Sequence, residues 1–206
     1  SLNDMTYNVT VQQGYVQGNL NAAGRKTEVE GQGGRRWVAT TGPIALDNAD
    51  SNLLDELRGL HTAANVSAIV VALGANDAGY VAGGSTDAIR QQRLTDTLVA
   101  IDVILNEMAG WGTCTALVTG PDNLACYFGI PDPWLYAWAA QQINQHLRNR
   151  VTAAPNWLRL RDFAALSANH HTWDADNWFA GDNLHLNDAG KLVYTNEIVQ
   201  GALACP

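Results

Sequence analysis

Basic residues are scarce in this sequence. Of 206 residues only Lys26 and Lys191 are lysine, and Lys and Arg together number 12 against 20 acidic residues. The resulting net charge of −8 argues against a nucleic-acid partner, because phosphate binding requires clustered Lys and Arg. Long hydrophobic runs are also missing: the longest span about seven residues, whereas a transmembrane helix requires about 20. The sequence therefore predicts no transmembrane segment.

Cysteine is the next scarce residue, with Cys114, Cys126 and Cys205 as the three examples. No Cys-x-x-Cys or Cys/His spacing indicates zinc, so no metal site is predicted. Cys114 and Cys126 flank a candidate strand and its exit loop, and we expect a disulfide between them. Cys205 would then have no partner among the cysteines of this sequence. The alternative to a disulfide is that all three cysteines are buried free thiols. A disulfide, few lysines and seven tryptophans favour a secreted, extracellular protein.

Strand and helix patterns alternate along the chain, without repeats, low-complexity tracts or linkers. Continuous apolar runs such as 68–73 are typical of strands buried on both faces of a parallel sheet. The expected strands are 27–31, 68–73, 115–120 and 157–162, and the expected helices are 52–63, 86–110, 133–151 and 187–204. This alternation over a chain of this length predicts one α/β domain, 1–206, with a parallel sheet and helices on both faces.

Two short polar stretches are candidates for a functional site. One follows a predicted strand, and the other precedes the last predicted helix. Gly-Ala-Asn-Asp, 74–77, comes directly after the strand of 68–73, where the ligand site of a parallel sheet lies. Asn76 and Asp77 either cap the next segment or take part in chemistry. Asp182 and His185, three residues apart, can meet in one turn, where a carboxylate fixes the tautomer of an imidazole. Taken alone, such a pair is more often a pair of surface loop residues.

Four short sequence motifs, in a fixed order along the chain, resemble those of a known family. They are Ser1-Leu2, a glycine at Gly34 (with Gly33 as the alternative), the block 74–77, and Asp-Asn-Leu-His at 182–185. Together they resemble the SGNH hydrolase family, also called GDSL esterases/lipases. That family has Gly-Asp-Ser-Leu, an oxyanion-hole glycine, Gly-x-Asn-Asp and Asp-x-x-His in this order.

The resemblance implies a three-layer α/β/α sandwich with a central parallel sheet, an SGNH or flavodoxin-like fold. It also exposes a departure, because the family has a strand and Gly-Asp before its serine and this chain has neither. We therefore expect the first strand to be missing from this chain. On the same reasoning we expect Cys205 to pair with a cysteine upstream of Ser1.

The resemblance further implies a serine esterase or lipase that cleaves carboxylic esters. Ser1 would be the nucleophile, His185 the base and Asp182 the residue that orients the imidazole. The oxyanion would be bound by the N–H groups of Ser1 and Gly34 and by the side-chain amide of Asn76. Asp77 is expected to accept backbone hydrogen bonds without a catalytic role. This chemistry requires no metal or organic cofactor.

The loops 120–133 and 168–183 are expected to border the site because they follow strands. Trp173 and Trp178 are the candidate substrate-binding residues, and aromatic walls suit a small-molecule, lipid or glycan ester alike. His170 and His171 are expected to face solvent.

Two other functions fit parts of this pattern. An N-terminal-nucleophile hydrolase would use the α-amine of Ser1 as its base, and would have stacked antiparallel sheets. A non-catalytic SGNH-like domain would bind a glycan or a protein without cleaving it.

Overall fold

The structure, a computed structural model, describes residues 9–26, 36–37, 53–63, 66–122 and 132–206. Within these residues one parallel sheet has the strand order β1-β2-β3. The strands are β1 (Ala68–Ala72), β2 (Cys114–Val118) and β3 (Leu158–Arg161). Strand β2 is the most deeply buried of the three, since both of its neighbours are strands and helices cover both of its faces. The expected strand 27–31 lies outside the described residues.

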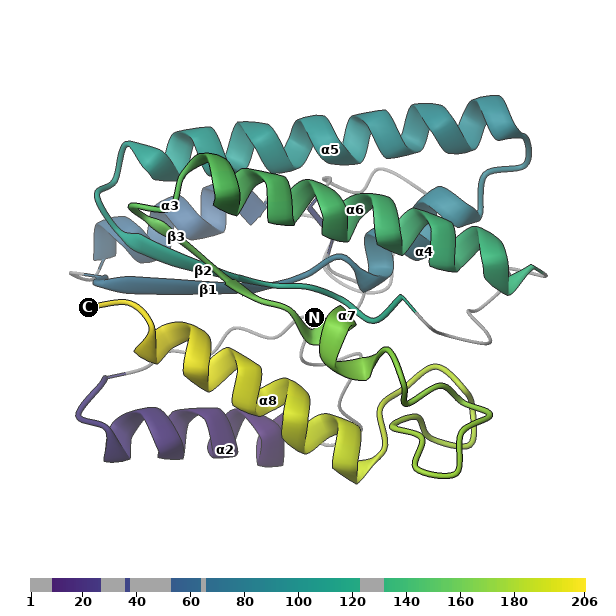
Figure 1. The fold of residues 1–206 in the computed structure, drawn as a ribbon. Coiled ribbons are helices and arrows are strands. Elements are labelled where there is room, and N and C mark those ends of the chain that lie inside the picture. The colour runs from purple at the N-terminus through teal and green to yellow at the C-terminus, as the bar shows by residue number, and fades with distance from the viewer. Residues whose placement is uncertain (1–8, 27–35, 38–52, 64–65, 123–131) are drawn as a thin grey trace.

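Helices cover both faces of the sheet. The described residues form α2 (Val9–Ala22), α3 (Leu53–Ala63), α4 (Ala75–Ala82), α5 (Asp87–Ala109), α6 (Pro133–Ala153), α7 (Phe163–Ser167) and α8 (Asp188–Leu203). Figure 1 shows α3, α4, α5 and α6 on one face and α2 and α8 on the other. The predicted α/β/α sandwich with a central parallel sheet is thus confirmed. None of the described helices is long and apolar enough to cross a membrane.

Local capping signals explain where the predicted helices begin. The side chain of Thr86 accepts a hydrogen bond from the Ile89 amide at the start of α5. Asp132 caps α6 in front of Pro133, and Asn187 caps α8 by accepting from the Gly190 amide at 3.0 Å. These helices lie within two residues of their predicted bounds. Helices α2, α4 and α7 were not predicted.

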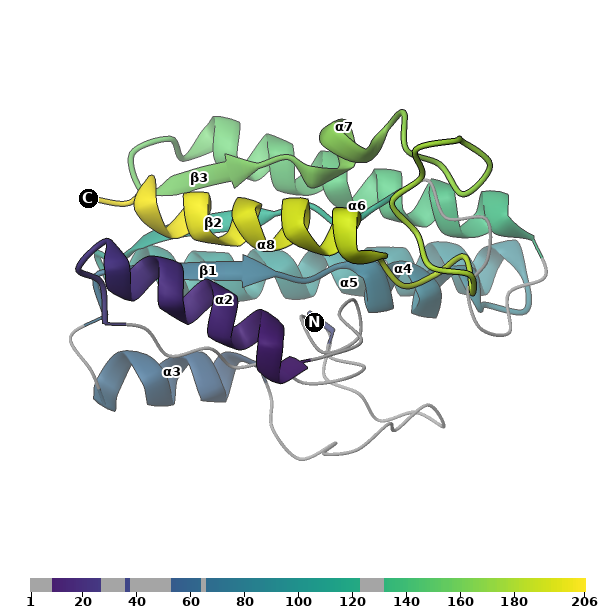
Figure 2. The same cartoon turned by 90° about the horizontal axis from the view of Figure 1, so that it is seen from below.

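Helix α8 lies very close to the sheet. A Cβ atom placed on Gly201 would lie 3.0 Å from Ala116, 3.3 Å from Arg161 and 3.5 Å from Val70, one residue from each strand. Arg161 also makes two 2.8 Å hydrogen bonds to Glu197, whose side chain is buried. These contacts fix α8 across the sheet, with its first residue at the carboxyl ends of the strands (Figures 1 and 2).

The disulfide predictions were wrong. Cys114 is bonded to Cys205, 91 residues later, and not to Cys126, and Cys205 therefore does not pair with an upstream cysteine. Strand β2 begins at the edge of the sheet where α8 ends, so the fold brings these two positions together (Figure 1). Nearness in sequence had favoured Cys126, which lies outside the described residues.

Replacing Cys205 with Ser should lower the free energy of unfolding by about 4 kcal/mol, because the bond closes a long loop in the unfolded chain. Urea denaturation of the variant and the parent measures this loss. Cys126→Ser leaves the observed bond intact and is the matched control. Equal losses in the two variants would contradict the Cys114–Cys205 assignment.

Candidate active site

The residues that follow β1 and β2 form the centre of the sheet's carboxyl end, where the parallel strands all terminate. Gly74, two residues after β1, has a φ of 126°, a conformation that favours glycine, and α4 begins at the next residue. Asn76 and Asp77 therefore lie in the first turn of a helix and not in a loop. Gly120 packs against this turn, since a Cβ atom there would lie 3.4 Å from the Ala75 nitrogen. Buried Asn144 holds Gly120 by accepting from its N–H and donating to its carbonyl.

Asp77 is fully buried and accepts backbone hydrogen bonds, as predicted. The Trp37 amide donates to its Oδ1 at 3.0 Å and to its Oδ2 at 3.2 Å. The partner segment lies 40 residues earlier in the chain. Asp77 thus fixes segment 36–37 to the first turn of α4, next to Asn76, whose side chain is half-buried.

Asp182 and His185 are in direct contact. The Oδ2 atom of Asp182 lies 2.6 Å from Nδ1 of the imidazole, and its Oδ1 accepts from the backbone amides of Leu184 and His185, both at 3.0 Å. Both side chains are half-buried. Because each carboxylate oxygen has a separate partner, the carboxylate cannot rotate without losing a hydrogen bond, and the imidazole is held in one orientation.

The loop around this pair is closed by its own backbone. Phe179 and Leu186 form an antiparallel bridge, and the Ala180 amide donates to the His185 carbonyl at 2.7 Å. Asn183 turns the chain with a φ of 58°, a left-handed conformation that asparagine tolerates. Asn187, which caps α8, also donates from its side chain to the Asn177 carbonyl at 2.7 Å. The position of His185 is thus coupled to the start of α8.

The pKa of Asp182 is lowered. Burial by itself raises the pKa of this carboxyl, but the hydrogen bonds from the His185 ring and from the Leu184 and His185 amides outweigh it. The carboxylate is therefore ionised at neutral pH and can stabilise a positively charged imidazole.

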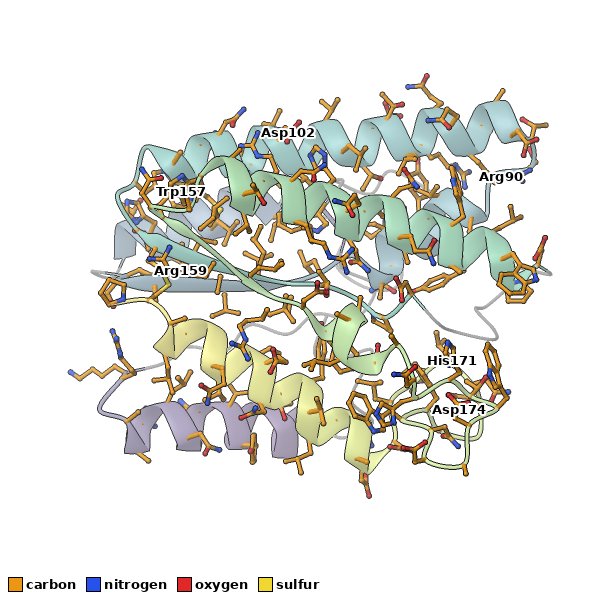
Figure 3. All side chains as sticks on the ribbon, in the orientation of Figure 1. Arg90, Asp102, Trp157, Arg159, His171 and Asp174 are labelled. Carbon is orange, nitrogen blue, oxygen red and sulfur yellow. A yellow bond between two sulfur atoms is a disulfide. The ribbon has the colours of Figure 1, made fainter. Side chains whose placement is uncertain are left out.

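Two further histidine–carboxylate pairs lie earlier in the same loop: Nδ1 of His170 lies 3.3 Å from Oδ2 of Asp176, and His171 contacts Asp174. Nδ1 of His171 lies 2.9 Å from Oδ2 of Asp174, and this same oxygen accepts from the His171 amide at 2.7 Å (Figure 3). The hydrogen bond from the His171 side chain lowers the pKa of Asp174. His170 and His171, which were expected to face solvent, are loop residues whose side chains are partly exposed, at 22% and 29%.

The two candidate substrate-binding tryptophans differ in their surroundings. Trp178 stacks on His170 with ring centroids 3.8 Å apart and also contacts Phe163. Trp173 stacks on His171 at 4.5 Å and remains 66% exposed. Trp178 therefore packs within the loop, while Trp173 presents apolar surface to solvent. Their role in substrate binding stays a prediction.

Sequence reasoning missed a polar cluster that ties β2, β3 and α6 together. Asp162, directly after β3, accepts from Thr119 at 3.0 Å and from Arg148 at 2.8 and 2.9 Å. Burial would raise the pKa of Asp162, but these hydrogen bonds and that of the Ala165 amide lower it overall. Burial raises the pKa of nearby Asp122. Asn76 was selected as a candidate site residue because it follows a strand. The same criterion would also have selected Thr119 and Asp162.

The predicted residues are thus only partly placed. Asp182 contacts His185 in the loop before α8, and Asn76 lies on α4 at the same end of the sheet (Figures 1 and 2). Ser1, Gly33 and Gly34 lie outside the described residues, and their roles stay predictions. Across the described parts of the chain, no group of three or more His, Cys, Asp or Glu side chains is placed to hold a metal ion.

Replacing His185 with Ala should raise the pKa of Asp182, because the ring hydrogen bond that lowers it is lost. The lowered pKa of Asp182 stabilises the folded protein at pH values above the ordinary aspartate pKa of about 3.9. This stabilisation is lost as the pH falls through the pKa of Asp182 in the folded state. Carboxyl NMR titration measures the shift. His171→Ala is the matched control: it should raise the pKa of Asp174 and leave that of Asp182 unchanged. An unshifted Asp182 in His185→Ala would contradict the pairing.

The chain was compared with known proteins. No protein-family model and no curated protein sequence matches it. Among solved structures it is similar to an extracellular lipase from Streptomyces rimosus, with a TM-score of 0.46, 13% identity, and 66% of this chain and 69% of the lipase covered. It is also similar to phospholipase A1 from Streptomyces albidoflavus NA297, with a TM-score of 0.45, 16% identity and the same coverage.

Proposed function

We propose that this protein is a serine-type hydrolase of carboxylic esters. The observation that supports it best is the Asp182–His185 pair, held in a closed loop at the carboxyl ends of the strands. Ser1 is the proposed nucleophile.

The hydrogen bond to Asp182 sets the chemistry of the imidazole. A proton on Nδ1 is shared with the carboxylate, so Nε2 is the nitrogen that accepts a proton. As the Ser1 hydroxyl attacks the ester carbonyl, its proton moves to Nε2 and the Asp182 carboxylate stabilises the imidazolium. The imidazolium then protonates the leaving alcohol. Water, activated by the same nitrogen, cleaves the acyl-enzyme and restores the serine.

Asn76 is the proposed side-chain donor to the oxyanion. It lies in the first turn of α4, where the unpaired amides of a helix start favour negative charge. Gly34, the proposed backbone donor, precedes Trp37 by three residues, a contour length of at most about 11 Å. Since Asp77 holds Trp37 beside Asn76, the chain can bring Gly34, or Gly33 as the alternative, close to the same point.

The substrate is a small-molecule, lipid or glycan ester, with Trp173 and Trp178 as the proposed contacts. Exposed Trp173 suits an apolar or sugar moiety. The Cys114–Cys205 disulfide supports a secreted, extracellular protein, since such bonds persist in oxidising compartments.

The structure bears differently on the two other candidate functions, an N-terminal-nucleophile hydrolase and a non-catalytic binding domain. An N-terminal-nucleophile hydrolase is disfavoured, because its stacked antiparallel sheets disagree with a parallel sheet between helices. A non-catalytic binding domain has the same fold as the proposed esterase, and only reactivity separates the two.

His185→Ala should reduce the turnover of p-nitrophenyl acetate by about three orders of magnitude or more, because it removes the base. Labelling of Ser1 by a fluorophosphonate probe, located by peptide mass spectrometry in the complete encoded protein, should fall in parallel. His171→Ala removes a comparable, carboxylate-bound histidine and should retain both signals. Parent protein that resists the probe would favour the binding domain, and loss of activity in His171→Ala alone would move the base to that residue.

Asn76→Ala should lower kcat by roughly 10²–10³-fold with little change in KM, because the donor acts mainly on the oxyanion. Steady-state kinetics on the same ester measures both constants. Asn149→Ala, which changes an exposed asparagine on α6, is the matched control and should match the parent. A rise in KM with unchanged kcat would show instead that Asn76 binds the substrate.

A further inference from the structure

Trp173 is exposed in the loop that carries His185, yet its ring is held in place. Its side chain is 66% exposed and stacks on the imidazole of His171, with ring centroids 4.5 Å apart and an angle of 13° between the ring planes. The imidazole is itself fixed, because Asp174 binds both its Nδ1, at 2.9 Å, and the His171 amide, at 2.7 Å (Figure 3). We call Trp173, His171 and Asp174 the tryptophan platform.

The backbone of the platform is tied to the loop of the proposed base. The Asp174 amide donates to the His171 carbonyl at 3.0 Å and closes a four-residue turn, in which the tryptophan is the third residue. The Asp174 carbonyl accepts from the side chain of Asn177 at 3.2 Å. Asn187, which caps α8, donates to the Asn177 carbonyl at 2.7 Å. Because Asn187 follows His185 by two residues, the platform and the imidazole of His185 share one framework of hydrogen bonds.

A series of ring contacts also joins this part of the loop to the core. His170, the residue before the platform histidine, stacks on Trp178 with centroids 3.8 Å apart. Trp178 contacts Phe163 at 6.0 Å, and Phe163 packs edge-on against buried Tyr194 of α8 at 4.8 Å. The exposed indole therefore projects from an anchored part of the loop.

The platform restrains a large side chain without burying it. Fixing side-chain rotamers lowers conformational entropy, and burial of apolar area normally offsets this loss. Single exposed apolar residues are common on protein surfaces, but nothing requires them to be held in one orientation. The imidazole covers one face of the Trp173 ring, so its exposed area lies mainly on the opposite face and the edges. A ring that is oriented before a ligand arrives is typical of a binding surface.

The surroundings of the ring favour a neutral sugar over an acyl chain. Trp173 is the one large apolar side chain that is exposed in the loop 168–183. It is followed by Asp174, whose pKa is lowered by the His171 hydrogen bond, and by Asp176, whose side chain is 75% exposed. A pyranose ring has C–H groups on its faces and hydroxyl donors on its rim, which match one aromatic ring beside carboxylate acceptors. An acyl chain requires a continuous apolar surface, and the carboxylates repel an anionic ligand.

We propose that Trp173, oriented by His171 and Asp174, is a stacking subsite for a neutral sugar ring that forms the alcohol part of the ester. The inference rests on the proposed esterase function and names its substrate class as carbohydrate esters. Hydrolysis breaks the bond between the acyl carbon and the sugar oxygen, and water supplies the hydroxyl of the acid and the proton of the sugar. Trp173 contacts the sugar, and His171 is a positioning residue. The competing role is a ring stack that only stabilises the loop.

Calorimetric titration of the whole protein with xylohexaose, with cellohexaose and with phosphatidylcholine vesicles tests the subsite directly. We expect a hexaose to bind and the vesicles not to bind. Trp173→Ala should weaken binding of that hexaose by about tenfold or more, and Trp173→Phe should have a smaller effect. Trp134→Ala is the matched control, because Trp134 is 76% exposed in the first turn of α6 and should not contribute.

Variants of His171 test its positioning role. His171→Ala, which removes the ring under the indole, should weaken hexaose binding by about threefold. His171→Phe restores a planar ring without the bond to Asp174 and should recover part of the affinity. A lower melting temperature of His171→Ala with unchanged affinity would show that this residue only stabilises the loop.

Kinetics then connects the subsite to the ester. The acetylated form of the bound hexaose and 4-nitrophenyl acetate carry the same acyl group and differ in their alcohol. Trp173→Ala should lower the ratio of kcat/KM for the acetylated hexaose to that for 4-nitrophenyl acetate by about tenfold, mainly through KM. An unchanged ratio would show that the ring does not contact the alcohol part of the substrate.

The outcomes separate this inference from the proposed function. Parent protein that binds neither hexaose, or equal affinities of Trp173→Ala and Trp134→Ala, would overturn the sugar subsite, as would vesicle binding that depends on Trp173. Turnover of 4-nitrophenyl acetate that depends on His185 would stand in each case. Conversely, hexaose binding that depends on Trp173 in a protein without ester turnover would overturn the esterase and retain the sugar site.

Discussion

The close packing of α8 on the sheet is the constraint on which the candidate site depends. Gly201 allows the helix to approach one residue of each strand, and a side chain at this position would force it away. The disulfide between Cys114 and Cys205 joins the end of the helix to the start of the central strand. At its other end, Asn187 caps the helix and holds the loop that contains His185. A displacement of α8 would therefore move the imidazole.

The sequence predicted those parts of the fold that are decided locally. Buried strands appear as continuous apolar runs, and α5, α6 and α8 begin at capping residues such as Thr86 and Asn187 that act within three residues. Helix α4 was missed because it contains glycine and its first turn is formed by a polar motif with the pattern of a loop. The Cys114–Cys205 bond was missed because the number of residues between two cysteines does not tell whether a strand and a helix meet at the same end of the sheet.

The same division applies to the candidate site. Asp182 and His185 could be paired from sequence because three residues suffice to bring them into contact. The acceptor role of Asp77 was predicted, but its donor, Trp37, lies 40 residues away and could not be identified. Arg36 and Arg93 likewise meet Tyr80 only after three elements have packed. The contacts that connect the blocks of the motif are thus tertiary, while the blocks themselves are local.

Histidine–carboxylate contacts recur within one loop, as in His171–Asp174 and His185–Asp182, which shows why contact alone does not identify a base. Asp174 uses a single oxygen for both the ring and the amide of His171. Asp182 divides its bonds, with one oxygen on two backbone amides and the other on the ring. His171 also stacks on exposed Trp173, whereas His185 lies two residues before the cap of α8. The second arrangement transmits the rigidity of the sheet to the imidazole, as a base that must meet a serine on another element requires.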